Sequence, residues 1–77
     1  MSAALIEYLA RRLVDQPDAV SVEQVEEDGA LVLRLRVAPD DVGRVIGRRG
    51  QVARALRTLA RAGGARGDRR VLLEIID

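Results

Sequence analysis

An apolar residue at every second position after an Asp-Gly pair limits the possible folds more than any other feature of this sequence. Residues 28–29 are Asp-Gly, and every second residue of the following run, 31–37, is Leu or Val, with Arg34 and Arg36 between them. An Asp-Gly pair favours a two-residue hairpin turn because both positions readily adopt positive φ. The alternation gives the following strand one apolar face. The sequence therefore predicts a β-hairpin whose apolar face the other elements must cover.

The strand before the turn is less regular. Val20 and Val22 alternate with polar residues, but Gln24 and Val25 then break the phase. Such a break indicates either a β-bulge or the end of the strand. A third, almost wholly apolar run at 71–76 predicts a short final strand.

The first segment has helical periodicity. Leu5, Leu9 and Leu13 recur at four-residue spacing with Ile6 beside them, which predicts one apolar stripe along a helix. A proline two residues after Asp15 disfavours further helix, so we expect the helix to end near Asp15.

Two more helices are predicted around a glycine pair. Pro39, followed by two aspartates, is typical of a helix start, and this helix lasts about two turns before Gly47. Gly50 then closes a two-residue loop, and a longer helix begins at about Gln51 and stops at the glycines 63–64. A polar loop at 65–70 leads to the last strand. The apolar side of the longer helix is expected to comprise Val52, Leu56, Leu59 and Ala60.

The order helix, strand, strand, helix, helix, strand predicts an α+β fold. We expect one domain over residues 1–77, in which three helices cover one face of a three-stranded sheet. The chain contains neither Cys nor His, which excludes disulfides, thiol chemistry and the usual zinc sites. No pair of carboxylates or hydroxyls has a spacing that indicates catalysis, so we expect no enzyme, no cofactor and no metal. Without a long apolar run or a signal-peptide pattern, a soluble cytoplasmic protein is expected.

Charge is distributed unevenly along the chain. Residues 43–70 contain nine Arg and one acid, whereas residues 1–42 contain four Arg and nine acids. Every basic residue is Arg, whose guanidinium matches phosphate geometry. Tyr8 is the one aromatic residue, which disfavours modules that stack bases on aromatic side chains. The pattern indicates a basic face for a polyanion; a solvated surface balanced by acids elsewhere is the alternative.

The segment GRVIGRRG, residues 43–50, combines the glycines with this charge. Its spacing differs from the dinucleotide-binding fingerprint, and it lacks the Lys-Ser/Thr pair of a P-loop. Gly47 and Gly50 bracket Arg48 and Arg49, so a backbone can approach closely where two cations and a helix N-terminus meet. A plain interhelical turn would explain the glycines but not the paired arginines.

VIGRRG, residues 45–50, followed by QVARALRTL, resembles the IGxxG core of a KH domain. In that family the GxxG loop clamps the backbone of about four nucleotides of single-stranded nucleic acid. The element order resembles the bacterial type II KH topology, and the whole chain resembles the family of small stand-alone bacterial RNA-binding proteins called KhpA.

The resemblance implies roles for particular residues. Gly47 and Gly50 would shape the loop, while Val45 and Ala53 are candidates for the apolar floor on which bases lie. Ordinary core is the alternative for such apolar positions, and it is the expectation for Ile46, Val52 and Leu56. Solvated helix surface is the alternative for the arginines of the longer helix. The predicted nucleic-acid-binding residues are Arg44, Val45, Gly47, Arg48, Arg49, Gly50, Ala53, Arg54 and Arg57.

The predicted function is therefore single-stranded RNA binding, in a post-transcriptional regulator or RNA chaperone of the kind linked to cell-envelope growth. The residues do not distinguish RNA from single-stranded DNA. The resemblance implies a homodimer, or a larger KH-containing protein of the KhpB type as partner, and no membrane or small-molecule substrate. The alternative is a KH-fold module for protein interaction or dimerisation with little RNA binding of its own.

Overall fold

The computed structural model describes residues 2–63 and 70–76. The predicted stop at Gly64 and most of the predicted polar loop lie outside these ranges. Short 3-10 turns precede β1, α2 and α3, at Pro17–Ala19, Pro39–Asp41 and Arg48–Gly50. The helices and strands are α1 (Ser2–Leu13), β1 (Ser21–Glu27), β2 (Ala30–Arg36), α2 (Val42–Ile46), α3 (Gln51–Gly63) and β3 (Val71–Ile76).

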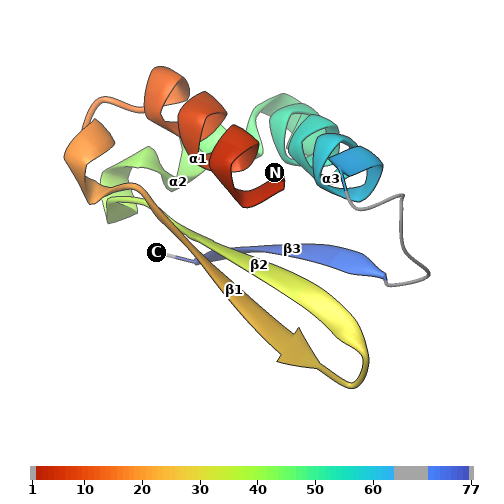
Figure 1. Ribbon diagram of the computed structural model, residues 1–77. Helices are drawn as coiled ribbons and strands as arrows, with labels where there is room; N and C mark the ends of the chain where they lie inside the picture. Colours follow the sequence, from red (N-terminus) through yellow and green to blue (C-terminus); the bar gives the residue numbers. More distant parts are fainter. Residues whose placement is uncertain (1, 64–69, 77) are drawn as a thin grey trace.

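The three strands form one mixed sheet in the order β1-β2-β3. β1 and β2 are antiparallel, whereas β3 runs parallel to β2. A parallel neighbour requires a crossover connection, and α2 and α3 supply it. All three helices lie on the same face of the sheet (Figure 1), which confirms the predicted α+β architecture.

The hairpin between β1 and β2 has the predicted two-residue turn. Asp28 and Gly29 both have positive φ, 51° and 80°. The pairing runs from Ser21↔Arg36 to Glu27↔Ala30 without an extra residue, so the prediction of a bulge or strand end at residues 24–25 is wrong. Val25 instead pairs with Val32 on the face away from the helices. The alternation breaks in the sequence because this face carries an apolar residue at position 25.

The core lies between the sheet and the helices. Leu33 and Leu35 of the central strand are fully buried, as the alternation predicts. Each helix contributes residues to the core around the central strand. The buried core cluster comprises Ile6, Ala10, Val20, Leu33, Leu35, Val37, Val45, Leu56, Ala60, Val71 and Leu73.

The predicted stripe of α1 does not face the sheet. Ile6 and Ala10 are fully buried, whereas Leu5 and Leu13 are about 40% exposed. The small side chain of Ala10 permits close approach to the sheet, so the helix rests on the line through Ile6 and Ala10. Leu5 and Leu13 are thereby rotated away from the sheet, whereas Ile6 lies in the core and Leu9 packs against it.

The open face of the sheet carries an ionic cluster across all three strands. Arg34 of β2 donates to Glu27 of β1 at 2.7 Å and to Glu74 of β3 at 3.1 Å. The hydrogen bond to Glu74 raises the pKa of the Arg34 guanidinium, with burial opposing and Glu27 adding to that shift. Arg34 thus forms ion pairs across both neighbouring strands, on the face of the sheet that the helices do not cover.

Candidate nucleic-acid interface

The loop between α2 and α3 depends on glycine at its first position. Gly47 has φ 78° and ψ 173°, and its N–H donates to the Gly43 carbonyl at 2.9 Å. A Cβ on Gly47 would lie 2.5 Å from Cγ2 and 2.9 Å from the backbone nitrogen of Val52. Side-chain-bearing residues rarely adopt that conformation, and the backbone nitrogen cannot swing away. Residue 47 must therefore be glycine for both conformational and steric reasons.

The second glycine has a milder requirement. Gly50 has φ 74°, but a Cβ there would meet nothing within 4 Å. Its N–H donates to the Gly47 carbonyl at 3.1 Å and closes the turn. Arg49 also has positive φ, 56°, which is uncommon for a residue with a side chain. The loop thus combines a fixed entry at Gly47 with a tight left-handed exit into α3.

Both loop arginines are exposed at the turn. Neither forms an ion pair or a side-chain hydrogen bond with any residue in the ranges that the structure describes. One turn into α3, the guanidinium of Arg54 lies 3.4 Å from the Arg49 carbonyl and so stands beside the loop. Three cations therefore surround the N-terminus of α3, where the helix dipole favours an anion.

A groove lies at the free edge of the sheet, beside turns of α3 that come later than this basic end. It has a volume of about 210 Å³ and lies between α3 and β3. Arg57, which the sequence predicted for the groove edge, lies there beside Arg61, one turn further along α3. Leu72 also lines the groove, but it pairs with Val32, so its side chain lies on the open face of the sheet, where it is 42% exposed. The lining residues are Arg57, Arg61, Val71, Leu72 and Leu73.

Sequence reasoning missed Arg61 and the groove residues of β3. The signal for Arg61 was its four-residue spacing from Arg57, which places both on one side of a helix. No comparable signal marks Leu72. Its position beside α3 arises from the parallel pairing of β3 with β2, which joins segments about forty residues apart.

Two predicted apolar groove residues are buried. Val45 is fully buried in the core cluster, and Ala53 is 3% exposed. Val45 has no surface on which a base could lie, so its prediction as groove floor is wrong. Ile46 was expected in the core, but it is only half-buried. The five-residue α2 turns Val45 inward because that position completes the packing around the central strand.

Arg44 is also placed differently from the prediction. Its guanidinium forms ion pairs with Asp15 at 2.8 Å and with Asp41 at 3.2 Å. Two carboxylates therefore oppose its charge, in contrast to the unpaired loop arginines. Asp41 was interpreted as a helix-start charge, yet its side chain makes no capping hydrogen bond to α2.

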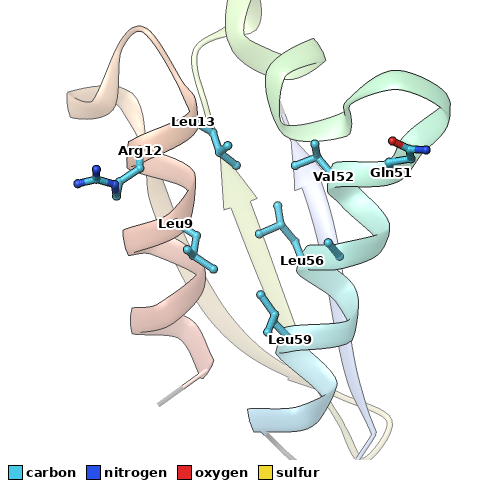
Figure 2. Close-up of a pocket in the computed structure, with 8 residues that line it drawn as sticks. Leu9, Arg12, Leu13, Gln51, Val52, Leu56 and Leu59 are labelled. Atoms are coloured by element: carbon cyan, nitrogen blue, oxygen red, sulfur yellow. The ribbon is translucent and has the colours of Figure 1, made fainter.

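A second concave surface lies on the other side of α3. An apolar groove of about 370 Å³ separates α1 from α3 and is lined almost wholly by apolar atoms. Leu9 and Leu13 of α1 point towards Leu56 and Leu59 of α3, whereas Arg12 points away (Figure 2). Leu13 and Leu59 are about 40% exposed at its rim. Two leucines of the predicted α1 stripe, Leu9 and Leu13, therefore line an open groove.

Among the described residues, no group of His, Cys, Asp or Glu is placed to hold a metal ion. No helix within the same ranges has the length and hydropathy needed to cross a membrane.

Comparison with known proteins agrees with this geometry. A protein named RNA-binding protein KhpA from Treponema pallidum is 51% identical over 77 residues, covering 100% of this chain and 96% of its own. A protein of the same name from Borreliella burgdorferi is 49% identical over 73 residues, covering 95% of this chain and 89% of its own.

Solved structures show the same fold at lower identity. A crystal structure of Aquifex aeolicus Era bound to GDP and AlF4⁻ matches with a TM-score of 0.66 and 21% identity. The match covers 96% of this chain and 29% of the Era chain. A second, of Era with MgGDPNP and nucleotides 1506–1542 of 16S ribosomal RNA, matches with a TM-score of 0.63 and 23% identity. The predicted type II KH fold is thereby confirmed.

The sequence also matches the family described as KhpA/KhpB, KH domain, over residues 3–75. This family is not enzymatic, as the sequence predicted. With its glycine-shaped loop, type II fold and full-length match, the chain belongs to the KhpA/KhpB KH-domain family.

Proposed function

We propose that this chain binds single-stranded RNA, with the phosphates at the loop of residues 47–50 and the bases along the groove between α3 and β3. The observation that carries the proposal is the pair of exposed arginines at a turn that only glycine can form. Arg48 and Arg49 have no counter-charge in the described ranges, so a phosphate backbone can neutralise them without breaking an existing pair. The name of the relatives, RNA-binding protein KhpA, supports RNA as the ligand.

The remaining RNA contacts of the proposal lie along α3 and the groove beside it. Arg54, Arg57 and Arg61 follow the loop along α3. Val71 and Leu73 of β3 lie across the groove from Arg57 and Arg61. A groove of this size accommodates few bases and contains no aromatic platform, so we expect modest affinity and shallow base preference. Binding should weaken steeply with salt because phosphate contacts release counterions.

The test is fluorescence anisotropy of short labelled single-stranded RNA, and of the matching DNA, across a salt series. The double variant Arg48→Gln/Arg49→Gln should bind at least about tenfold more weakly and should flatten the log–log salt slope by roughly 1.4. The matched control Arg11→Gln/Arg36→Gln removes two exposed arginines on α1 and on the sheet, and it should retain the slope of the wild type. Equal binding by the loop variant and the wild type would refute the loop assignment. Equal affinity for RNA and DNA would show that the site does not read the 2′-hydroxyl.

The apolar groove between α1 and α3 supports a second function, self-association. Leu13 on α1 and Leu59 on α3 are about 40% exposed on the two walls of this groove, so two copies related by a two-fold axis can each place one wall in the groove of the other. A core this small gains from covering such a surface. We propose that the chain acts as a homodimer through this groove, or with a larger KH-containing protein of the KhpB type, in post-transcriptional regulation or RNA chaperoning.

Sedimentation velocity over a concentration series tests self-association. Leu59→Glu should shift the protein to a monomer, because a carboxylate cannot be buried in the apolar contact without a partner. Leu72→Glu is the matched control: Leu72 is similarly exposed but lies outside this groove. A wild type that stays monomeric at high concentration would exclude the homodimer.

A further inference from the structure

Asp41 is the one buried charged side chain within the described ranges, with 1% of its surface exposed. It lies immediately before α2. Its Oδ1 accepts a hydrogen bond from the Asp15 N–H at 3.2 Å, and its Oδ2 accepts one from the Gln16 N–H at 3.1 Å. The carboxylate thus binds the backbone just beyond the end of α1, about twenty-five residues away in sequence.

Arg44 completes this arrangement from the next turn. Its Nε lies 3.2 Å from Oδ1 of Asp41, and its Nη2 lies 2.8 Å from Oδ2 of Asp15. No buried side-chain polar atom among the described residues lacks a hydrogen-bond partner, so the buried carboxylate is fully satisfied. A buried charge is tolerated only under such conditions, which makes its partners specific.

The position of this pair matters because α2 is short. A helix of five residues has little stability of its own and takes its orientation from tertiary contacts. Asp41 and Arg44 fix its beginning to the end of α1. Its last residue is followed directly by Gly47, whose N–H is bonded back to Gly43. A rotation of α2 would therefore move the entry of the loop.

We propose that Asp41 is a positioning residue for the RNA-binding loop and acts through Arg44. The charge of Arg44 is directed to the two carboxylates and makes no phosphate contact. This inference rests on the proposed function of the loop, and it assigns Arg44 a role different from that of Arg48 and Arg49.

The test compares the RNA affinities and salt slopes of Asp41→Asn, Arg44→Gln and the corresponding double variant. Each single variant should bind RNA about tenfold more weakly than the wild type with an unchanged salt slope. The double variant should bind RNA no more weakly than the weaker-binding single variant, because both substitutions break the same Asp41–Arg44 ion pair. Arg48→Gln supplies the reference for a phosphate contact and should flatten the slope by roughly 0.7. The control is Asp40→Asn, the same change at the exposed neighbouring residue, which should bind like the wild type.

Three results would overturn the proposal. They are a flattened slope for Arg44→Gln, wild-type affinity for Asp41→Asn, and tighter binding by Asp41→Asn with a steeper slope. The last would show that Arg44, once released, contacts phosphate. A normal slope and affinity for Arg48→Gln would instead refute the loop function itself.

Amide hydrogen exchange separates positioning from stability and requires no RNA. In Arg44→Gln, whose altered side chain is half exposed, the Gly47 and Gly50 amides should exchange faster while the β2 amides keep their wild-type rates. Asp41→Asn should show the same pattern of amide exchange as Arg44→Gln, at a temperature where circular dichroism shows that it is folded. Equal acceleration in the loop and in β2 would show a purely global effect on stability and refute the positioning role.

Discussion

The two glycines of the proposed RNA-binding loop look equivalent in the sequence, but they meet different physical requirements. Gly47 has a positive φ that other residues rarely adopt, and it also lies close to Val52. Gly50 has only the positive φ. Conformational strain alone costs a side-chain-bearing residue about 1 kcal/mol in the left-handed region. A contact of 2.9 Å with a backbone nitrogen adds a cost that no rotamer change relieves.

Substitution by alanine should therefore separate the two positions. We expect Gly47→Ala to lower the free energy of unfolding by about 3 kcal/mol, from strain and overpacking together. Gly50→Ala should lower it by about 1 kcal/mol. Urea denaturation followed by circular dichroism measures both. Equal losses at the two positions would mean that Val52 moves aside and that the close approach is not limiting.

Within the single helix α3, residues on different sides lie in three different environments. Leu56 is buried against the sheet, Leu59 rims the apolar groove towards α1, and Arg57 faces the groove beside β3. One helix thereby joins the core, the proposed association surface and the proposed RNA site. Neighbouring residues of the same type should consequently differ in what they contribute.

The matched substitutions Leu56→Ala and Leu59→Ala test this division. Leu56→Ala should destabilise the fold by about 3 kcal/mol because it leaves a cavity in the core. Leu59→Ala should cost less than about 1 kcal/mol in the monomer, since 39% of the side chain is already exposed. Urea unfolding at low protein concentration compares the two. A larger loss for Leu59 would indicate that the groove is closed in the folded monomer.

At the scale of the whole molecule, the proposed association surface and the proposed RNA site lie on opposite sides of α3. Two copies joined through the α1–α3 groove would keep both RNA sites open. Linking two weak sites raises the affinity for an RNA long enough to reach both.

Leu59→Glu should reveal this linkage. On an RNA that fills one site, the variant should bind as the wild type does, whereas on a longer RNA it should bind at least about tenfold more weakly. Anisotropy titrations with the two RNAs at equal salt measure the difference. If the variant loses affinity equally for both RNAs, the substitution has damaged the RNA site, and the linkage proposal is wrong.

The local structure and the residue chemistry of the loop could be predicted from the sequence alone. The Asp-Gly turn, the alternation of β2 and the arginines between Gly47 and Gly50 depend on backbone preferences and residue types within a few positions. These signals predicted the element order, the fold class and the KH resemblance, and the family match and the solved structures confirm them.

Which side of each element is buried depends on the tertiary structure. Rotation of α1 onto Ile6 and Ala10 placed two leucines of the predicted stripe on the wall of a groove, and α2 turned Val45 inward. Asp41 likewise gained its role from backbone groups about twenty-five residues away. Periodicity records that a face is apolar, but packing among several elements sets how far it rotates, because close packing is a property of all the contacting surfaces together.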